Sequence, residues 1–245
     1  MSRASLWRRR DVWRRKPVLR MLYGDWYRTI VSHLQPGLTL EVGGGSGNLK
    51  EFAAAVICTD VVEVPWLDAV ADAQRLPFAS GSLANVVLFD ALHHIERPRL
   101  FFDEAVRVLR PGGRLVVMDP YISWLSWPVY RFLHPELLDF SGDLLTPAAA
   151  ERSWQPGDAN QAVATILFER SFDDFQRRYP QLRKLAHQRH AFFAYPLSGG
   201  FDRPSLLPLS LVRPLLALER ALGSLGRILA FRMLVVLERT APSTS

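Results

Sequence analysis

A run of glycines directly after a short apolar segment constrains the fold of this chain more than any other feature. Residues 38–42 read Leu-Thr-Leu-Glu-Val, and residues 43–47 read Gly-Gly-Gly-Ser-Gly. Glycine has no Cβ, so such a turn lets the backbone approach a ligand that a side chain would exclude. We therefore predict a strand over 38–42, then a ligand-binding turn, then a helix over about residues 48–55.

Further apolar runs recur at the spacing of a parallel α/β sheet, and they predict strands over 56–60, 67–70, 84–89 and 114–118. The link after residue 60 is too short to hold a full helix. A helix is predicted to begin at Pro98, since proline suits the first helical turn, and to end at Pro111-Gly112-Gly113. This alternation predicts an α/β fold of the Rossmann-like, doubly wound type with a mostly parallel sheet.

The chain after residue 120 follows this pattern less closely, because residues 121–160 are rich in aromatic residues and proline. Beyond them we predict a helix over 172–179, an apolar helical insertion over 205–230, and strands over 181–190 and 233–238. We expect one structural domain with a helical cap. Its three parts are a basic helical lead-in (1–36), a cofactor-binding core (37–120), and the rest of the sheet with substrate-side insertions (121–245).

Positive charge is concentrated at the beginning of the chain. Residues 1–35 hold nine arginines and lysines against two aspartates, while the whole chain has a net charge of +6. The remainder is near neutral, which disfavours nucleic acid as a partner. The basic segment is either a solvated terminus or a contact surface for an anionic membrane. Likewise, residues 205–230 form either a lid packed on the sheet or a shelter for a lipid-like acceptor.

The sequence also indicates a compartment. Cys58 is the single cysteine and lies in an apolar run, so we expect a buried thiol in a reducing environment. No apolar, uncharged stretch between residues 205 and 237 approaches the length of a membrane span, and no signal peptide is evident. We expect a cytoplasmic protein, with peripheral contact at the inner membrane surface as the alternative.

Three carboxylates stand where a nucleoside ligand would need them. Asp60 ends the second strand, at nearly the distance from the glycine turn expected of a carboxylate that binds ribose hydroxyls. Asp72 follows the third strand, where it can accept from an adenine amino group or simply form a turn. Glu41 precedes the turn within an apolar strand, and burying an unpaired charge is costly. A cationic ligand would offset that cost.

Two other nucleotide motifs fit the glycine turn poorly. A nicotinamide fingerprint that begins at Gly43 needs a glycine at position 48, and that residue is Asn48. A P-loop ends in Gly-Lys-Ser/Thr, which is absent here. A nicotinamide oxidoreductase is therefore disfavoured.

Four sequence motifs follow one another in order: LEVGGGSG (40–47), DAQRLPF (72–78), LFDALHHI (88–95) and EAVRVLRPGG (104–113), with Asp60 between the first two. Together they make residues 38–120 similar to the type 11 family of class I methyltransferases, which includes quinone-biosynthesis methyltransferases. The resemblance implies S-adenosylmethionine as the cofactor and S-adenosylhomocysteine as the product. The short link after Asp60 and the long region after residue 120 depart from the family and leave the acceptor open.

The resemblance also assigns roles to individual residues. It places Asp60 at the ribose, Asp72 and Ala73 at the adenine, and Asp90 and Ala91 beside the reactive methyl group. The residues it places around the methionine part are Glu41, Gly43, Gly44, Gly45 and Gly47.

A pair of histidines, His93 and His94, follows the fourth strand at the edge where open α/β sheets bind ligands. An imidazole titrates near neutral pH, so either residue, His94 slightly in preference to His93, could take a proton from an acceptor, or it could simply bond the loop. Tyr121, Tyr130 and His134 either line the acceptor pocket or pack in the core. The histidines are adjacent or scattered, so we predict no metal site.

These observations predict an S-adenosylmethionine-dependent methyltransferase that acts on a small-molecule or lipid-linked acceptor. The alternative is a non-catalytic protein that keeps the same fold and serves as a binding or regulatory partner.

Overall fold

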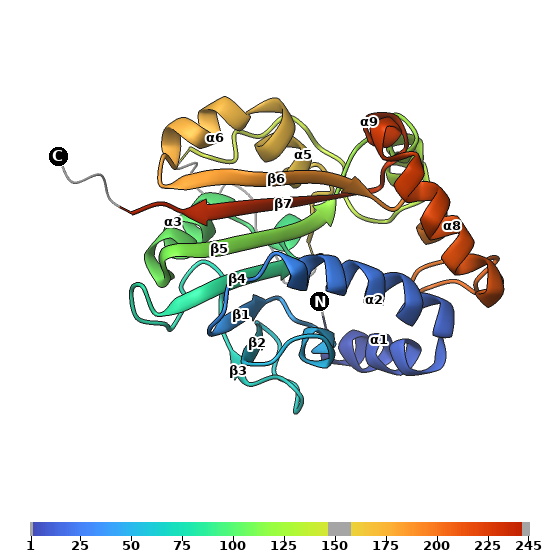
Figure 1. Ribbon diagram of the computed structural model, residues 1–245, viewed down its shortest axis with the longest axis horizontal. Coiled ribbons are helices and arrows are strands. Elements are labelled where there is room, and N and C mark those ends of the chain that lie inside the picture. Colours follow the sequence, from blue (N-terminus) through green and yellow to red (C-terminus); the bar gives the residue numbers. More distant parts are fainter. Residues whose placement is uncertain (1, 147–157, 242–245) are drawn as a thin grey trace.

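The computed structural model describes residues 2–146 and 158–241, which form one sheet in the strand order β3-β2-β1-β4-β5-β7-β6 (Figure 1). Strands β1 to β5 pair in parallel, whereas β7 runs antiparallel to both β5 and β6. This confirms the doubly wound, mostly parallel sheet. The strands are β1 (Thr39–Val42), β2 (Val56–Asp60), β3 (Ala69–Val70), β4 (Leu83–Phe89), β5 (Leu109–Pro120), β6 (Leu182–His190) and β7 (Arg232–Arg239).

Helices cover both faces of the sheet and gather beyond its carboxyl edge. They are α1 (Arg3–Arg15), α2 (Pro17–Ser32), α3 (Pro98–Val108), α4 (Ser126–Phe132), α5 (Val163–Thr165), α6 (Phe172–Arg178), α7 (Ala194–Ser198), α8 (Leu209–Ala221) and α9 (Gly226–Leu229). Short 3-10 turns span Asn48–Glu51, Leu92–His94 and Gly223–Leu225, and a π-helical turn spans Ile166–Arg170. The expected helices at 172–179 and within 205–230 are therefore confirmed.

The central strands divide their side chains between two nonpolar clusters, as the alternation along a strand requires. In β4, Val86 and Leu88 join the cluster that α3, α5 and α6 cover. Val87 and Phe89 point the other way and join the cluster built on α2 and α8. Both faces of β4 are fully covered, which explains its almost unbroken apolar sequence.

Two expected boundaries were wrong. The helix expected over 48–55 is only a 3-10 turn, Asn48–Glu51. Ala55 adopts a positive φ of 53°, and its carbonyl accepts from the Thr39 amide, so the chain must leave helical geometry before β2 begins. The strand expected over 114–118 extends from Leu109 to Pro120, and α3 ends at Val108. The Pro-Gly-Gly sequence therefore lies in this strand, opposite a register shift in β4, instead of ending the helix.

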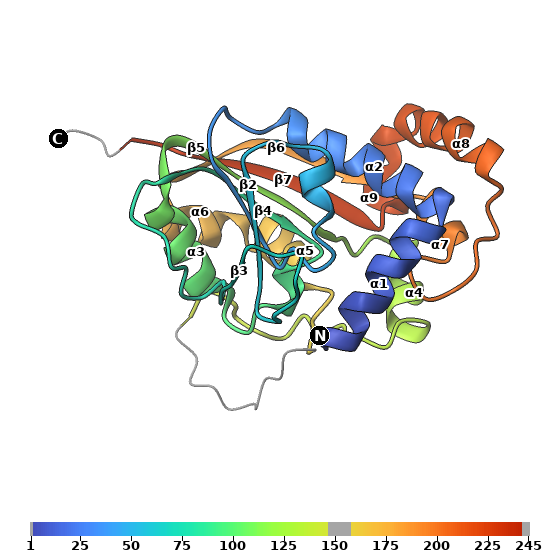
Figure 2. The same cartoon turned by 90° about the horizontal axis from the view of Figure 1, so that it is seen from below.

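The basic lead-in is helical, as expected, and is folded onto the body. Ser2 and Ser5 form a capping box at the start of α1. Leu6 and Trp13 are buried on the inner face of α1, while Arg14 lies on its exposed face. Figures 1 and 2 show α1, α4, α7, α8 and α9 at the same end of the molecule, beyond the carboxyl ends of the parallel strands. They form a helical cap over the edge where ligands bind in such sheets.

One buried ion pair connects the end of β4 to the start of β7. Asp90 follows β4 with a positive φ of 54°, and its carboxylate pairs with the guanidinium of Arg232, which is 3% exposed. The guanidinium also lies over the rings of Tyr195, at 4.6 Å, and Trp26, at 5.0 Å. The pair thus fixes α2, α7, β4 and β7 around one point.

We expect Arg232→Leu to lower the free energy of unfolding by roughly 3 kcal/mol, near the lower end of the range for a broken buried ion pair. The lower end applies because the Asp90 side chain is 23% exposed and keeps some hydration. Adding Asp90→Asn should recover part of the loss, since asparagine removes the unpaired charge and tolerates a positive φ. Chemical denaturation of the three proteins measures this, and a double variant no more stable than Arg232→Leu would contradict it.

Candidate active site

The glycine turn after β1 has the backbone geometry expected of a close approach. Gly43, Gly45 and Gly47 all have positive φ, at 67°, 46° and 70°. A Cβ on Gly43 would lie 2.7 Å from the Cβ of Ala91, so this position admits no side chain. Ala91 therefore supports the turn from the end of β4.

A narrow cavity of about 50 Å³ lies over this turn at the carboxyl edge of the sheet. Of the predicted cofactor residues, it is lined by Glu41, Gly43, Gly44, Gly45 and Asp90. The other lining residues were not predicted: Leu6, Arg9, Tyr23, Tyr27, Ser46, Asn48, Phe89 and Phe201. Pockets that enclose small ligands usually measure about 300–1,000 Å³. The cavity is therefore smaller than a pocket that encloses a whole small ligand.

Glu41 is a buried carboxylate in the wall of this cavity, with an exposure of 2%. Its Oε2 accepts from the Cys58 thiol at 2.8 Å, and no arginine or lysine of the described residues forms an ion pair with it. Burial raises the pKa of Glu41 to about 7. Burial and the same carboxylate also raise the pKa of the Cys58 thiol, which stays protonated as the donor. A cation in the cavity would stabilise the ionised form of Glu41.

Asp60 accepts hydrogen bonds from the backbone in and near the glycine turn, and it is not among the residues that line the cavity. Its two carboxylate oxygens accept from the amides of Gly45 and Val62, each at 3.1 Å. In this conformation Asp60 holds the turn in shape. Whether it also meets ribose hydroxyls stays a prediction.

The remaining predicted cofactor residues lie farther from the cavity. Asp72 is exposed and accepts from the Gln74 amide at 2.9 Å, which is the turn-forming arrangement, while Ala73 packs in the core. Gly47 lies beside the ring of Trp66. Asp90 reaches the cavity but is paired with Arg232. The adenine and methyl-end assignments therefore stay predictions.

Helix α1 covers the glycine turn and closes the cavity. The Trp7 and Trp66 rings meet edge to face with centroids 4.6 Å apart, and the Arg10 guanidinium lies 4.4 Å from the Trp66 ring. The Trp66 indole donates to the Gly45 carbonyl at 2.9 Å, and Arg10 donates to the Ser46 carbonyl at 3.3 Å. Nothing in the local sequence of α1 indicated this contact, because helical periodicity shows which face is buried but not against what.

His93 and His94 belong to a cluster at the next strand end. His93 Nδ1 lies 3.0 Å from Asp119 Oδ1, and its amide donates to Asp119 Oδ2 at 3.1 Å. On the other side, His93 Nε2 is 3.7 Å and His94 Nε2 is 4.0 Å from the Glu136 carboxylate. The sequence analysis did not identify Glu136, because it lies more than forty residues from the histidines with no motif between them.

The two imidazoles have opposite pKa shifts. Burial lowers the pKa of His93, but the charge and hydrogen bond of Asp119 outweigh burial and raise it overall. Burial and neighbouring His93 lower the pKa of His94 to about 4. His93 is therefore the imidazole that carries positive charge first as the pH falls.

Tyr121 and Tyr130 pack in the core, so the acceptor-pocket alternative gains no support from them. Tyr121 belongs to one nonpolar cluster and Tyr130 to the other, and the Tyr130 hydroxyl donates to the Phe231 carbonyl at 2.9 Å. His134 lies beside the cluster, with Nδ1 3.8 Å from Glu136 Oε2.

The class of domain follows from the fold together with a family match. Residues 40–117 match a protein family that is described as a methyltransferase domain. The sheet order, the glycine turn and this match identify a class I methyltransferase domain and confirm the resemblance seen in the sequence motifs.

Known proteins of this class resemble parts of the chain. A demethylmenaquinone methyltransferase from Beutenbergia cavernae is 35% identical over 107 residues, 43% of this chain and 42% of that protein. A malonyl-[acyl-carrier protein] O-methyltransferase from Hahella chejuensis is 50% identical over 48 residues, 20% of this chain and 17% of that protein. The chain thus spans less than half the length of either relative.

One solved structure is similar over almost the whole fold. It is an S-adenosylmethionine-dependent methyltransferase from Archaeoglobus fulgidus, with a TM-score of 0.55 and 11% identity. The similarity covers 90% of this chain and 94% of that protein. At this identity the likeness shows a shared fold.

The buried Glu41 makes stability depend on pH. Its folded pKa of about 7 lies above the ordinary value of 4.5, so between these pH values the folded protein holds a proton that the unfolded chain has lost. Stability therefore falls as the pH rises through this window. We expect Glu41→Gln to raise the free energy of unfolding by about 3 kcal/mol at pH 8 and by less than about 1 kcal/mol near pH 5.

Denaturant unfolding at the two pH values measures this difference. Glu63→Gln, at an exposed position, is the matched control and should change stability at neither pH. Equal stability of wild type and Glu41→Gln at pH 8 would show that burial does not destabilise the ionised Glu41 carboxylate.

Proposed function

We propose that this protein transfers a methyl group from S-adenosylmethionine to a small-molecule or lipid-linked acceptor. The observation that carries the proposal is Glu41, a buried carboxylate without a cationic partner among the described residues, placed in the cavity over the glycine turn. S-adenosylmethionine carries an ammonium and a sulfonium group, whereas a dinucleotide would bring a pyrophosphate. The Glu41 carboxylate thus favours the sulfonium cofactor.

The residues over the glycine turn fit this cofactor once α1 moves. Gly43 and Gly45 adopt positive φ, and as glycines they present backbone and no side chain to the ligand. Leu6 and Arg9 of α1 fill the space above them. We infer that α1 is displaced when the cofactor enters and closes again over it.

The cofactor supplies an electrophilic methyl group on sulfur, which is a good leaving group. The protein contributes mainly by holding acceptor and methyl group in line, an effect worth roughly 7–11 kcal/mol in well-oriented cases. In our proposal Glu41 binds the ammonium group, the glycine turn orients the methionine part, and α1 excludes water.

A hydroxyl acceptor must also lose a proton, and the histidine pair is the candidate base. Both imidazoles are held at Nδ1, but the carboxylate of Asp119 raises the pKa of His93, whereas burial and His93 lower the pKa of His94 to about 4. This arrangement corresponds to the carboxylate–imidazole pair of other general bases. We therefore favour His93 over His94, which reverses the preference drawn from the sequence.

The first test is calorimetric titration with S-adenosylmethionine, S-adenosylhomocysteine and NADH. We expect saturable binding of both sulfur ligands and none of NADH. Glu41→Gln should weaken binding at least tenfold, because it removes the charge that meets the ammonium group. Asp60→Ala should also weaken it, because the Gly45 amide loses its acceptor.

Asp173→Ala, at an exposed position on α6, is the control and should bind like wild type. If a folded wild-type protein binds neither sulfur ligand, the enzymatic proposal is wrong and a non-catalytic binding protein is the better description.

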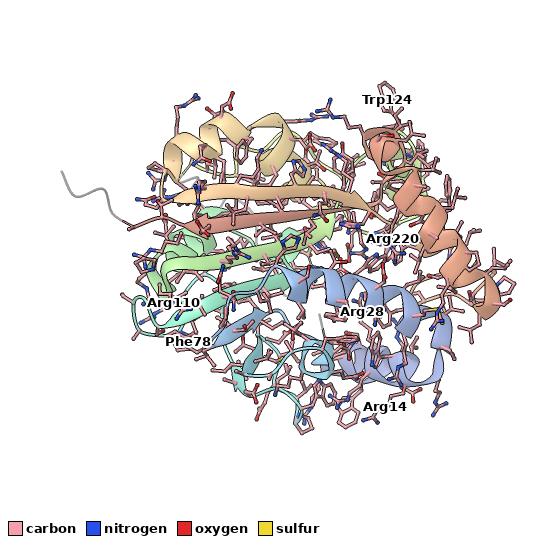
Figure 3. All side chains as sticks on the ribbon, viewed as in Figure 1. Arg14, Arg28, Phe78, Arg110, Trp124 and Arg220 are labelled. Carbon is pink, nitrogen blue, oxygen red and sulfur yellow. The ribbon has the colours of Figure 1, made fainter. Side chains whose placement is uncertain are left out.

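A membrane is the proposed source of a lipid-linked acceptor. Apolar side chains are unusually exposed at the capped end of the molecule: Trp124 by 84%, Phe132 by 69% and Leu206 by 79%. Figure 3 shows Trp124 projecting outward beside α9 and Arg14 projecting outward from α1. Exposed tryptophans and arginines together suit the headgroup region of a bilayer. In the described part of the chain, no helix has the length and hydropathy to cross a bilayer.

Vesicle cosedimentation tests this contact. We expect binding to vesicles with anionic lipid and weaker binding to zwitterionic ones. Since each basic residue near the surface contributes about 1 kcal/mol, Arg14→Gln with Arg15→Gln should reduce binding by about thirtyfold. Arg177→Gln, on exposed α6, should have little effect. Equal binding of all proteins to both vesicle types would remove the membrane from the proposal.

A further inference from the structure

We propose that His93, His94 and Glu136 form a binding site for a divalent metal ion of the zinc class. One ligand atom from each residue lies within 4.8 Å of the other two. The site goes beyond the methyl transfer proposed above, and it uses none of the residues that line the cofactor cavity.

The local backbone brings the two histidine rings to the same side. Adjacent residues of a strand point in opposite directions, but His93 and His94 lie on the 3-10 turn after β4. Their ring centroids are 4.2 Å apart and their planes are inclined by only 38°. The adjacency of His93 and His94 in the sequence argued against a metal site, but in this turn the two rings can face the same ion.

Hydrogen bonds select the nitrogen of each ring that can bind a metal. His93 Nδ1 lies 3.0 Å from a carboxylate oxygen of Asp119, and His94 Nδ1 lies 3.0 Å from the carbonyl oxygen of Asp158. Both partners can only accept, so each Nδ1 carries its hydrogen and each Nε2 carries the lone pair. A carboxylate or carbonyl behind the imidazole is the arrangement that orients histidine ligands in metal sites.

The three side chains must contract around an ion to form a tetrahedral site. In a tetrahedral zinc site, ligand atoms about 2.0–2.1 Å from the metal lie roughly 3.4 Å from one another. The Glu136 oxygens lie 3.7 Å from His93 Nε2 and 4.0 Å from His94 Nε2. These two separations would shorten by roughly half an ångström, and the largest separation among the three ligand atoms, which is at most 4.8 Å, would shorten by up to about 1.4 Å. Two imidazoles and one carboxylate also form the ligand set of open, catalytic zinc sites.

The charges and the buried polar groups favour a cation here. Asp119 is fully buried, and no arginine or lysine of the described residues pairs with it or with Glu136. Gln161 donates to Glu136, and its buried Oε1 has no donor in the described part of the chain. A divalent ion would balance the two carboxylates, and a water on its open position would supply a donor.

Metal binding and proton transfer compete for the same atoms. A bound ion takes the Nε2 lone pairs of both histidines, so a loaded site cannot use either imidazole as a base. It would instead bind an acceptor oxygen and lower its pKa. The two uses of the cluster can therefore be separated by experiment.

The test is titration of tag-free, chelator-treated protein with Zn²⁺ and with Co²⁺, whose visible absorption reports the ligand geometry. We expect one ion per chain. Glu136→Gln and His94→Gln, both at partly exposed positions, should weaken binding at least tenfold, and Asp119→Asn by about 10–100-fold. His33→Gln, beside Arg114 at a distance from the cluster, is the control and should bind like wild type.

Circular dichroism of each variant shows that it is folded. Wild-type protein that binds no ion, or that binds it no more tightly than folded Glu136→Gln, would overturn the inference. S-adenosylhomocysteine titrated in parallel separates the two proposals. Cofactor binding without metal binding rejects only the metal site, and the reverse rejects only the proposed cofactor.

Discussion

The ion pair between Asp90 and Arg232 holds together parts of the fold that are far apart in sequence. A guanidinium can remain buried among Trp26 and Tyr195 because it has a carboxylate partner and faces the electron-rich rings. Asp90 in turn leaves β4 in a left-handed conformation that directs its carboxylate toward β7. The inner wall of the cavity, where Asp90 and Phe89 lie, depends on this pairing.

The carboxyl edge of the sheet collects acidic residues, because parallel strands end at the same side. Glu41, Asp60, Asp90 and Asp119 stand at or just beyond the ends of β1, β2, β4 and β5. Their partners differ: a thiol, two backbone amides, an arginine and an imidazole. Of these four, Glu41 has the weakest partner for a full negative charge. This difference explains why Glu41 is suited to meet a cationic ligand, whereas the other three carboxylates hold neighbouring parts of the fold in place.

The strands, the mostly parallel sheet and the glycine turn could be predicted, because local periodicity and turn chemistry specify them. The same logic singled out Glu41, whereas Asp90 was singled out by the family resemblance. It could not identify Leu6, Arg9 or Phe201, because docking of distant helices leaves no local pattern in the sequence. The strand-end argument could also have identified Asp119, because this residue lies at the carboxyl end of β5, next to β4.

The strand-end argument could not identify Glu136, because this residue does not follow a strand. The helix after the glycine turn was predicted too long. In the first case a loop is placed by tertiary packing. In the second, the positive φ of Ala55 and its hydrogen bond to Thr39 override helix propensity.

The position of α1 has a consequence for the speed of turnover. In the proposed binding mode, a cofactor held beneath this helix leaves only after the Trp7–Trp66 and Arg10–Ser46 contacts break. Exchange of a ligand is then limited by the rate at which the helix opens, and not by its affinity for the cavity alone. A protein built in this way can bind its ligand modestly at equilibrium and still retain it long enough for a slow partner to arrive.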